Sequence, residues 1–175
     1  YTTGFGTFPV KASSTFPTGD SQVFVTKFDI NQSGNNSLIY STRIGGGAFT
    51  HSKGRSISVN NTGNVFVTGT IYTTGSINYP TTTGAYSNVY NSGQDGVMSF
   101  VTKLSNTLPV TLSYSTFLTP GIANGIAVNP ATDEAFIIGS TETFAFPVTP
   151  GALQTTHAGA GGTDAYVVKL SALGD

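Results

Sequence analysis

Short runs of β-branched, aromatic and alternating polar residues recur along the chain, and glycine, asparagine, serine or proline bounds each run. Val23–Phe28, Leu38–Thr42 and Asn64–Gly69 are three of these runs. Such runs are typical of short, half-buried β-strands. No ten-residue stretch places apolar residues at helical spacing, and 22 glycines and 8 prolines interrupt the chain. The pattern therefore predicts an all-β protein.

The same runs return in the same order after about 70 residues, which makes the chain an internal repeat. Leu38–Thr42 (LIYST) returns as Leu112–Thr116 (LSYST), and Val65–Gly69 (VFVTG) returns as Ala135–Gly139 (AFIIG). A third landmark occurs three times and carries a lysine before its last residue, in Val23–Phe28, Ser99–Leu104 and Asp164–Leu170. The differences in spacing between landmarks belong in loops, which absorb insertions at little cost.

Four predicted strands make up one period, and we name them A to D in the order of a propeller blade. Strand A covers 57–59 and 126–128, strand B 65–70 and 135–140, strand C 23–28, 100–104 and 165–170, and strand D 38–42 and 112–116. Repeated four-stranded antiparallel sheets that pack radially form a β-propeller. The chain supplies about two and a half such blades, so we expect a ring that this chain alone does not close.

The predicted domain organisation is a single repeat array over residues 1–175. A partial blade covers about 1–45, a complete blade 54–118 and a second partial blade 123–175. Open sheet edges and faces at the ends of such an array tend to pair with other chains. We therefore expect the partners to be further blades of the same protein or identical copies, which could form a filament.

The stretch from Ala123 to Leu170 resembles a known family. It contains GIAVN, AFIIGST, FPVTPGALQTT and GGTDAYVVKL, and the LSYST strand precedes it. Together these segments resemble the bacterial β-propeller repeat, often called the SBBP repeat. The resemblance implies a large secreted or cell-surface protein, and it brings no catalytic motif whose residues could be carried over.

Composition agrees with an extracellular or cell-surface location and narrows the function. Only 9% of the residues are charged and the net charge is −1, which argues against nucleic-acid binding. There is no cysteine, and no apolar run approaches the roughly 18 residues of a membrane span. No Gly-x-Ser-x-Gly motif and no recurring pair of acidic residues occurs, so we expect a protein that is not an enzyme.

The long connections between strands B and C, residues 71–97 and 141–163, are the predicted place for ligand contacts, because loops on rigid scaffolds carry function. Tyr72 and Tyr90 have no repeat equivalent and could stack on a sugar or a partner protein. His51 and His157 lie in connections on the same predicted face, although a solvated loop histidine explains each as well. By contrast, the repeated Tyr79 and Phe146 are expected to pin the loops to the blade, with Tyr86 and Leu153 doing the same further on.

No cofactor is expected, and Ca²⁺ is the one candidate metal. Asp20, Asp95 and Asp164 each precede a predicted strand C, and Asp95 lies in an oxygen-rich loop (NSGQDG) of the kind that can hold Ca²⁺. Their differing distances from the following lysine favour a turn-capping role instead. The repeated lysines should cover the sheet with their stems and extend their ammonium groups to water, and the repeated tyrosines Tyr40 and Tyr114 should pack between blades.

These observations predict a non-enzymatic, extracellular structural or adhesive module, part of a larger surface protein or self-assembling through open sheet edges. The alternative is a lectin-like module that binds carbohydrate or protein on the face with the long B-to-C loops. We also expect a buried core at nine apolar positions, namely Phe24, Ile57, Val59, Phe66, Phe100, Ile126, Val128, Phe136 and Tyr166.

Overall fold

The structure, a computed structural model, describes residues 21–91, 96–158 and 161–175. Within these ranges the regular structure consists of β-strands and one short 3-10 helix, η1 (Gly34–Asn36), with no α-helix. The nine strands are β1 (Val23–Phe28), β2 (Leu38–Ile44), β3 (Thr50–Val59), β4 (Val65–Thr73), β5 (Val97–Leu104), β6 (Leu112–Pro120), β7 (Ile122–Val128), β8 (Ala135–Thr141) and β9 (Asp164–Leu170). The prediction of an all-β protein is therefore confirmed.

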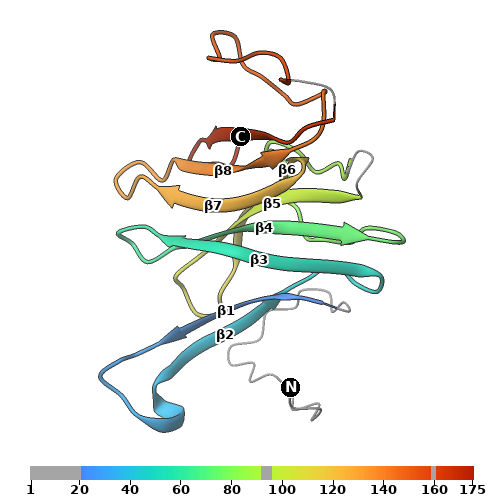
Figure 1. The fold of residues 1–175 in the computed structure, drawn as a ribbon. Coiled ribbons are helices and arrows are strands. Elements are labelled where there is room, and N and C mark those ends of the chain that lie inside the picture. Colours follow the sequence, from blue (N-terminus) through green and yellow to red (C-terminus); the bar gives the residue numbers. More distant parts are fainter. Residues whose placement is uncertain (1–20, 92–95, 159–160) are drawn as a thin grey trace.

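The strands form three antiparallel sheets in chain order. The first sheet contains β1-β2, the middle sheet β3-β4-β5-β6 and the last sheet β7-β8-β9. The sheets follow one another through the molecule from the N-terminal to the C-terminal side (Figure 1), and in the described part of the chain they do not close into a ring. This arrangement of two, four and three strands agrees with the C-D, A-B-C-D, A-B-C order that the repeat predicts.

Every predicted strand is present, but several are longer than the apolar runs that identified them. β3 begins at Thr50, where the sequence is polar, because its first residues pair with the last residues of β4 from Thr73 inwards. β6 likewise continues to Pro120, opposite Met98 of β5. Backbone pairing extends these strands beyond the apolar runs, so the runs alone mark their centres better than their ends.

A β-bulge recurs in the first strand of the middle and last sheets. The register shifts between Gly54 and Ser56 in β3, and between Ala123 and Gly125 in β7. The bulged strand approaches a glycine in its neighbour so closely that a Cβ would not fit. A Cβ on Gly69 would lie 1.9 Å from the Lys53 carbonyl oxygen, and one on Gly139 would lie 2.2 Å from that of Ile122. The repeated glycine thus fixes this close approach.

Two apolar clusters fill the spaces between the sheets. Val25, Tyr40 and Ile44 of the first sheet pack with Val67 and Phe100 of the middle sheet. On the other side of the middle sheet, a second cluster joins it to the last sheet and contains Phe66, Val101, Tyr114, Leu118, Ala123, Ala135, Ile137, Tyr166 and Leu170. The predicted packing of Tyr40 and Tyr114 between sheets is confirmed.

The predicted core is correct at some of its nine positions and wrong at others. Phe66, Phe100 and Tyr166 are buried, as predicted, and Ile126 and Val128 are half-buried. Four positions predicted to be buried are instead exposed, namely Phe24 (62%), Ile57 (56%), Val59 (53%) and Phe136 (40%).

Each of the four exposed residues lies on a sheet surface that its neighbouring sheet does not cover. Ile57 is the register partner of Val67 on the face toward the first sheet; that sheet reaches β3 near Gly54 but leaves Ile57 exposed. Phe136 has the repeat position of Phe66 but lies in the last sheet, and Phe24 has the repeat position of Phe100 but lies in the first. An apolar strand residue is buried only when another sheet packs on its face.

Candidate functional site

Two aromatic side chains meet at the end of the middle sheet, where β3 begins and β4 ends. His51 and Tyr72 are register partners in the antiparallel pair, so their side chains leave the same face of the sheet. Their rings are stacked at an interplanar angle of 25° with centroids 6.0 Å apart. The structure therefore brings together two of the four residues that the sequence put forward for ligand contacts.

Beside these rings lies a cavity of about 460 Å³ between the middle and last sheets, within the size range of small-molecule sites. The residues that line it are Ser21, His51, Lys53, Arg55, Thr70, Tyr72, Val97 and Ile122. Lys53 and Thr70 are register partners, and Arg55 is the extra residue of the β3 bulge. Because of the bulge, the cavity is lined by two cations, Lys53 and Arg55; in a regular strand only Lys53 would be expected to face it.

Lys53 and Arg55 give this cavity a positive charge. Both side chains are exposed, and among the described residues neither belongs to an ion pair or a side-chain hydrogen bond. Among the residues that the structure describes, no carboxylate lines the cavity. Sequence reasoning missed both residues, although a signal was present: two of only seven lysines and arginines are separated by a single glycine.

Tyr90 and His157 do not line this cavity, and each packs against a different aromatic residue. The Tyr90 ring packs edge-on against Phe117 at 5.6 Å, and its hydroxyl donates a 2.8 Å hydrogen bond to the Gly96 carbonyl oxygen. The His157 ring lies 4.8 Å from that of Phe144, and its Nδ1 is 3.9 Å from a carboxylate oxygen of Asp164. The structure therefore does not gather the four predicted ligand residues into one site.

The long connection between β4 and β5 runs along the outer edge of the middle sheet. Its Thr82 amide donates to the Ser115 carbonyl of β6, and its Ser87 carbonyl accepts from the amide of Phe117. Tyr79 is buried against Phe100 at 5.0 Å, which confirms its predicted role of pinning the loop. This connection covers the outermost strand, whose edge would otherwise expose unpaired backbone groups.

The connection between β8 and β9 extends away from the sheets (Figure 1). Phe146 packs on Tyr166 at 5.1 Å, as predicted for the equivalent of Tyr79. Leu153 is fully exposed and Tyr86 is 47% exposed, so the predicted second pinning contact is wrong in both loops. The two loops therefore share one anchor and differ beyond it.

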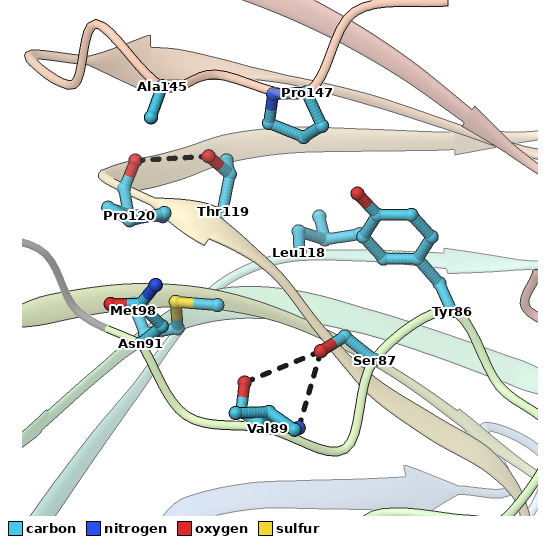
Figure 2. Close-up of a pocket in the computed structure, with 10 residues that line it drawn as sticks. All are labelled: Tyr86, Ser87, Val89, Asn91, Met98, Leu118, Thr119, Pro120, Ala145 and Pro147. Atoms are coloured by element: carbon cyan, nitrogen blue, oxygen red, sulfur yellow. Dashed lines mark hydrogen bonds between the residues drawn. The ribbon is translucent and has the colours of Figure 1, made fainter.

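A second cavity, of about 390 Å³, opens between the two long loops and the ends of β5 and β6 (Figure 2). Figure 2 shows Ala145 and Pro147 on one side and Ser87 and Val89 on the other, with Met98 and Leu118 between them. Its remaining lining residues are Tyr86, Asn91, Thr119 and Pro120. The described lining residues include no charged group, and they offer an apolar surface with a few hydrogen-bonding groups.

The repeated lysines make specific contacts instead of extending freely into water. Lys103 is nearly buried, and its Nζ lies 2.9 Å from an Asp133 carboxylate oxygen in the hairpin turn of the last sheet. Asn60 Nδ2 donates to the other oxygen of Asp133 at 2.6 Å, and the lysine ammonium lies 5.1 Å from the Phe66 ring centroid. The hydrogen bond from Lys103 lowers the pKa of Asp133 from its ordinary value of 3.8. We call Lys103, Asp133 and Asn60 the carboxylate clamp.

The equivalents of Lys103 are bound differently. Lys27 Nζ donates to Asn106 Oδ1 of the middle sheet at 2.7 Å, and Lys169 forms an exposed 2.7 Å ion pair with Glu134 of its own sheet. The backbone at Asp133 is also unusual. Asp133 has a φ of 61° at the turn position whose repeat equivalent, Gly63, has a φ of 81°. An aspartate there accepts backbone strain that glycine avoids, and its carboxylate joins two sheets.

The candidate calcium residues give no metal site in the described part of the chain. Asp95 and Asp20 lie outside the described residues. Asp164 accepts a 2.7 Å hydrogen bond from the Ala158 amide, which agrees with a turn-capping role. Among the described residues no group of three or more histidine, aspartate or glutamate side chains is placed to hold a metal ion.

Comparisons with known proteins supply no identity for this arrangement. No protein-family model matches the chain, and no curated protein matches it. The described residues also include no helix long and apolar enough to cross a membrane.

Proposed function

We propose that the chain is a non-enzymatic structural or adhesive module of an extracellular β-propeller-type repeat protein, whose outer sheet faces pack against further sheets. The supporting observation is that equivalent apolar residues are buried on the middle sheet and exposed on the last sheet. Phe66 and Val101, on the middle sheet, are fully buried under the last sheet, whereas their equivalents Phe136 and Val167, on the last sheet, are 40% and 71% exposed. Ile138, the register partner of Val167, is also exposed.

The first sheet presents the complementary half of the same contact. In the interior, Tyr166 and Leu170 of the last sheet pack against the face that carries Phe66 and Val101. Their equivalents in the first sheet are Phe24 and Phe28, which are both about 60% exposed. The exposed face of the last sheet therefore resembles the middle-sheet face that carries Phe66 and Val101. The exposed face of the first sheet resembles the last-sheet face that packs against the middle sheet. A further sheet of the same protein, or a second copy packed head to tail, fits this arrangement.

Sedimentation velocity across about 1–100 µM protein tests the proposal, because a head-to-tail contact depends on concentration. We expect wild-type chains to associate, and the double variant Ile138→Asp with Val167→Asp to remain monomeric. Leu153→Asp is the matched control, since it also replaces an exposed apolar residue by a charge but lies in a loop. A wild-type chain that stays a soluble, compact monomer over the whole range contradicts the proposal.

The second candidate function is lectin-like binding, and one observation favours it. The His51–Tyr72 stack lies at a cavity that also contains hydroxyl groups and two cations, Lys53 and Arg55, that form no ion pair with any described residue. This cavity lies at the face from which the β4–β5 connection leaves the sheet. Binding there is independent of the sheet faces, so one chain can perform both roles.

A further inference from the structure

The cavity beside His51 and Tyr72 carries chemistry that the rest of the repeat lacks. Its four distinctive side chains are His51, Lys53, Arg55 and Tyr72. The equivalent positions in the next copy of the repeat hold Pro120, Ile122, Asn124 and Glu142. The backbone is nevertheless the same in both copies, because the bulge in β3 recurs in β7 and the close-approach glycine recurs in β8. The same backbone arrangement therefore carries aromatic and cationic side chains in one copy, and neither an aromatic nor a cationic side chain at the equivalent positions of the other.

The aromatic part of the cavity provides a flat surface that a ligand can cover. Tyr72 is 42% exposed, and the stacked His51 ring lies against it. The negative face of an aromatic ring attracts the weakly positive C–H groups on the apolar face of a sugar ring. Gly96 lies close to one edge of the Tyr72 ring, where an added Cβ would be 3.1 Å from a ring carbon.

The cationic part provides the charge selectivity. Arg55 presents a planar fork of N–H donors that matches the two oxygens of a carboxylate, and Lys53 adds a second positive charge. Thr70 and Ser21 add hydroxyl groups at the lining. A polyanionic nucleic acid fits less well, since two cations in a chain of net charge −1 give little phosphate neutralisation.

We propose that this cavity binds a saccharide that bears a carboxylate, with the sugar ring on Tyr72 and the carboxylate on Arg55 and Lys53. The proposal rests on the second candidate function and specifies its ligand class. The volume of about 460 Å³ holds one sugar residue with its neighbouring linkages exposed. The ligand is therefore a residue within an acidic polysaccharide or oligosaccharide.

Isothermal titration of the full chain with trigalacturonate tests this proposal, with the methyl ester of the same trisaccharide as the neutral match. We expect the acid to bind at least about tenfold more tightly than the ester, because a charge-assisted hydrogen bond is lost in the ester. Arg55→Gln and Lys53→Gln should each weaken the binding of the acid by about tenfold or more. Tyr72→Ala should weaken both ligands, whereas Tyr72→Phe should retain them.

Lys169→Gln is the matched control, because it removes one exposed positive charge outside the cavity and should leave binding unchanged. Equal binding of acid and ester would overturn the carboxylate proposal and leave lectin-like binding standing. Binding of neither saccharide would overturn both, and the sedimentation test of sheet packing would be unaffected. A sulfated glucose oligosaccharide that binds as tightly as the acid would show general anion binding and overturn the carboxylate assignment.

Discussion

Phe66 and Phe136 hold the same position in two copies of the repeat, yet the first is fully buried and the second is 40% exposed. Both lie in the second strand of their sheet, and both are register partners of a lysine in the next strand, Lys103 and Lys169 respectively. The difference arises because the last sheet covers Phe66, and no described sheet covers Phe136. The repeat pattern thus determines which face a side chain takes, and the neighbouring sheet determines whether that face is buried.

Truncating each of the two phenylalanines should give the largest difference in stability between the two sheets. Phe66→Ala removes a fully buried ring that contacts Tyr114 and the Lys103 ammonium, so we expect a loss of about 3–5 kcal/mol in the free energy of unfolding. Phe136→Ala should cost about 1 kcal/mol or less, because much of that ring is already in water. Urea denaturation of both variants measures the difference. Equal losses would mean that the face of the last sheet is covered in solution.

The carboxylate clamp gives the next effect. Asp133→Asn keeps the shape of the side chain but removes the charge that Lys103 requires, and Lys103 is only 8% exposed. We expect a loss of about 1–2 kcal/mol, below the cost of breaking a fully buried pair because Asp133 is partly exposed. Thermal unfolding measures it. Glu134→Gln, in the exposed pair with Lys169, is the control, and a larger effect there than at Asp133 would contradict the comparison.

The same clamp predicts a dependence of stability on pH. The hydrogen bond from Lys103 lowers the folded-state pKa of Asp133 below its ordinary value of 3.8. This contribution is therefore fully present above that value and is lost as the pH falls through the lower folded-state pKa. We expect wild-type stability to fall more steeply than that of Asp133→Asn as the pH drops below about 4. Denaturation curves at several acidic pH values measure both slopes, and parallel slopes would exclude Asp133 as a contributor.

The sequence predicted the elements well because its signals are local. Apolar runs and turn residues marked all nine strands, and the repeat ordered them into sheets. The burial of Phe24 and Ile57 could not be predicted in the same way, since it depends on how far a neighbouring sheet extends. The pattern identifies a strand but carries no information about the area of its covering sheet.

The candidate site shows the same division between local and non-local information. Tyr72 and His51 stood out as aromatic and titratable residues in loops, and cross-strand register brought them together. Tyr90 stood out for the same reason, but it packs against Phe117, a contact between residues far apart in the sequence. Arg55 was missed because its placement depends on a bulge, and the bulge follows from strand pairing and not from any single residue.

A valine on each of the two sheet faces should give a smaller difference in stability than the two phenylalanines. Val101 and Val167 are repeat equivalents, but Val101 is fully buried whereas Val167 is 71% exposed. Val101→Thr places a hydroxyl in the apolar space between two sheets, which should cost about 1–3 kcal/mol, whereas Val167→Thr should stay within about 0.5 kcal/mol of wild type. Urea denaturation should be done at low protein concentration, where a second copy is absent. If Val167→Thr becomes more destabilising as the concentration rises, the exposed face is one that another chain covers, because association adds to the stability of the folded state.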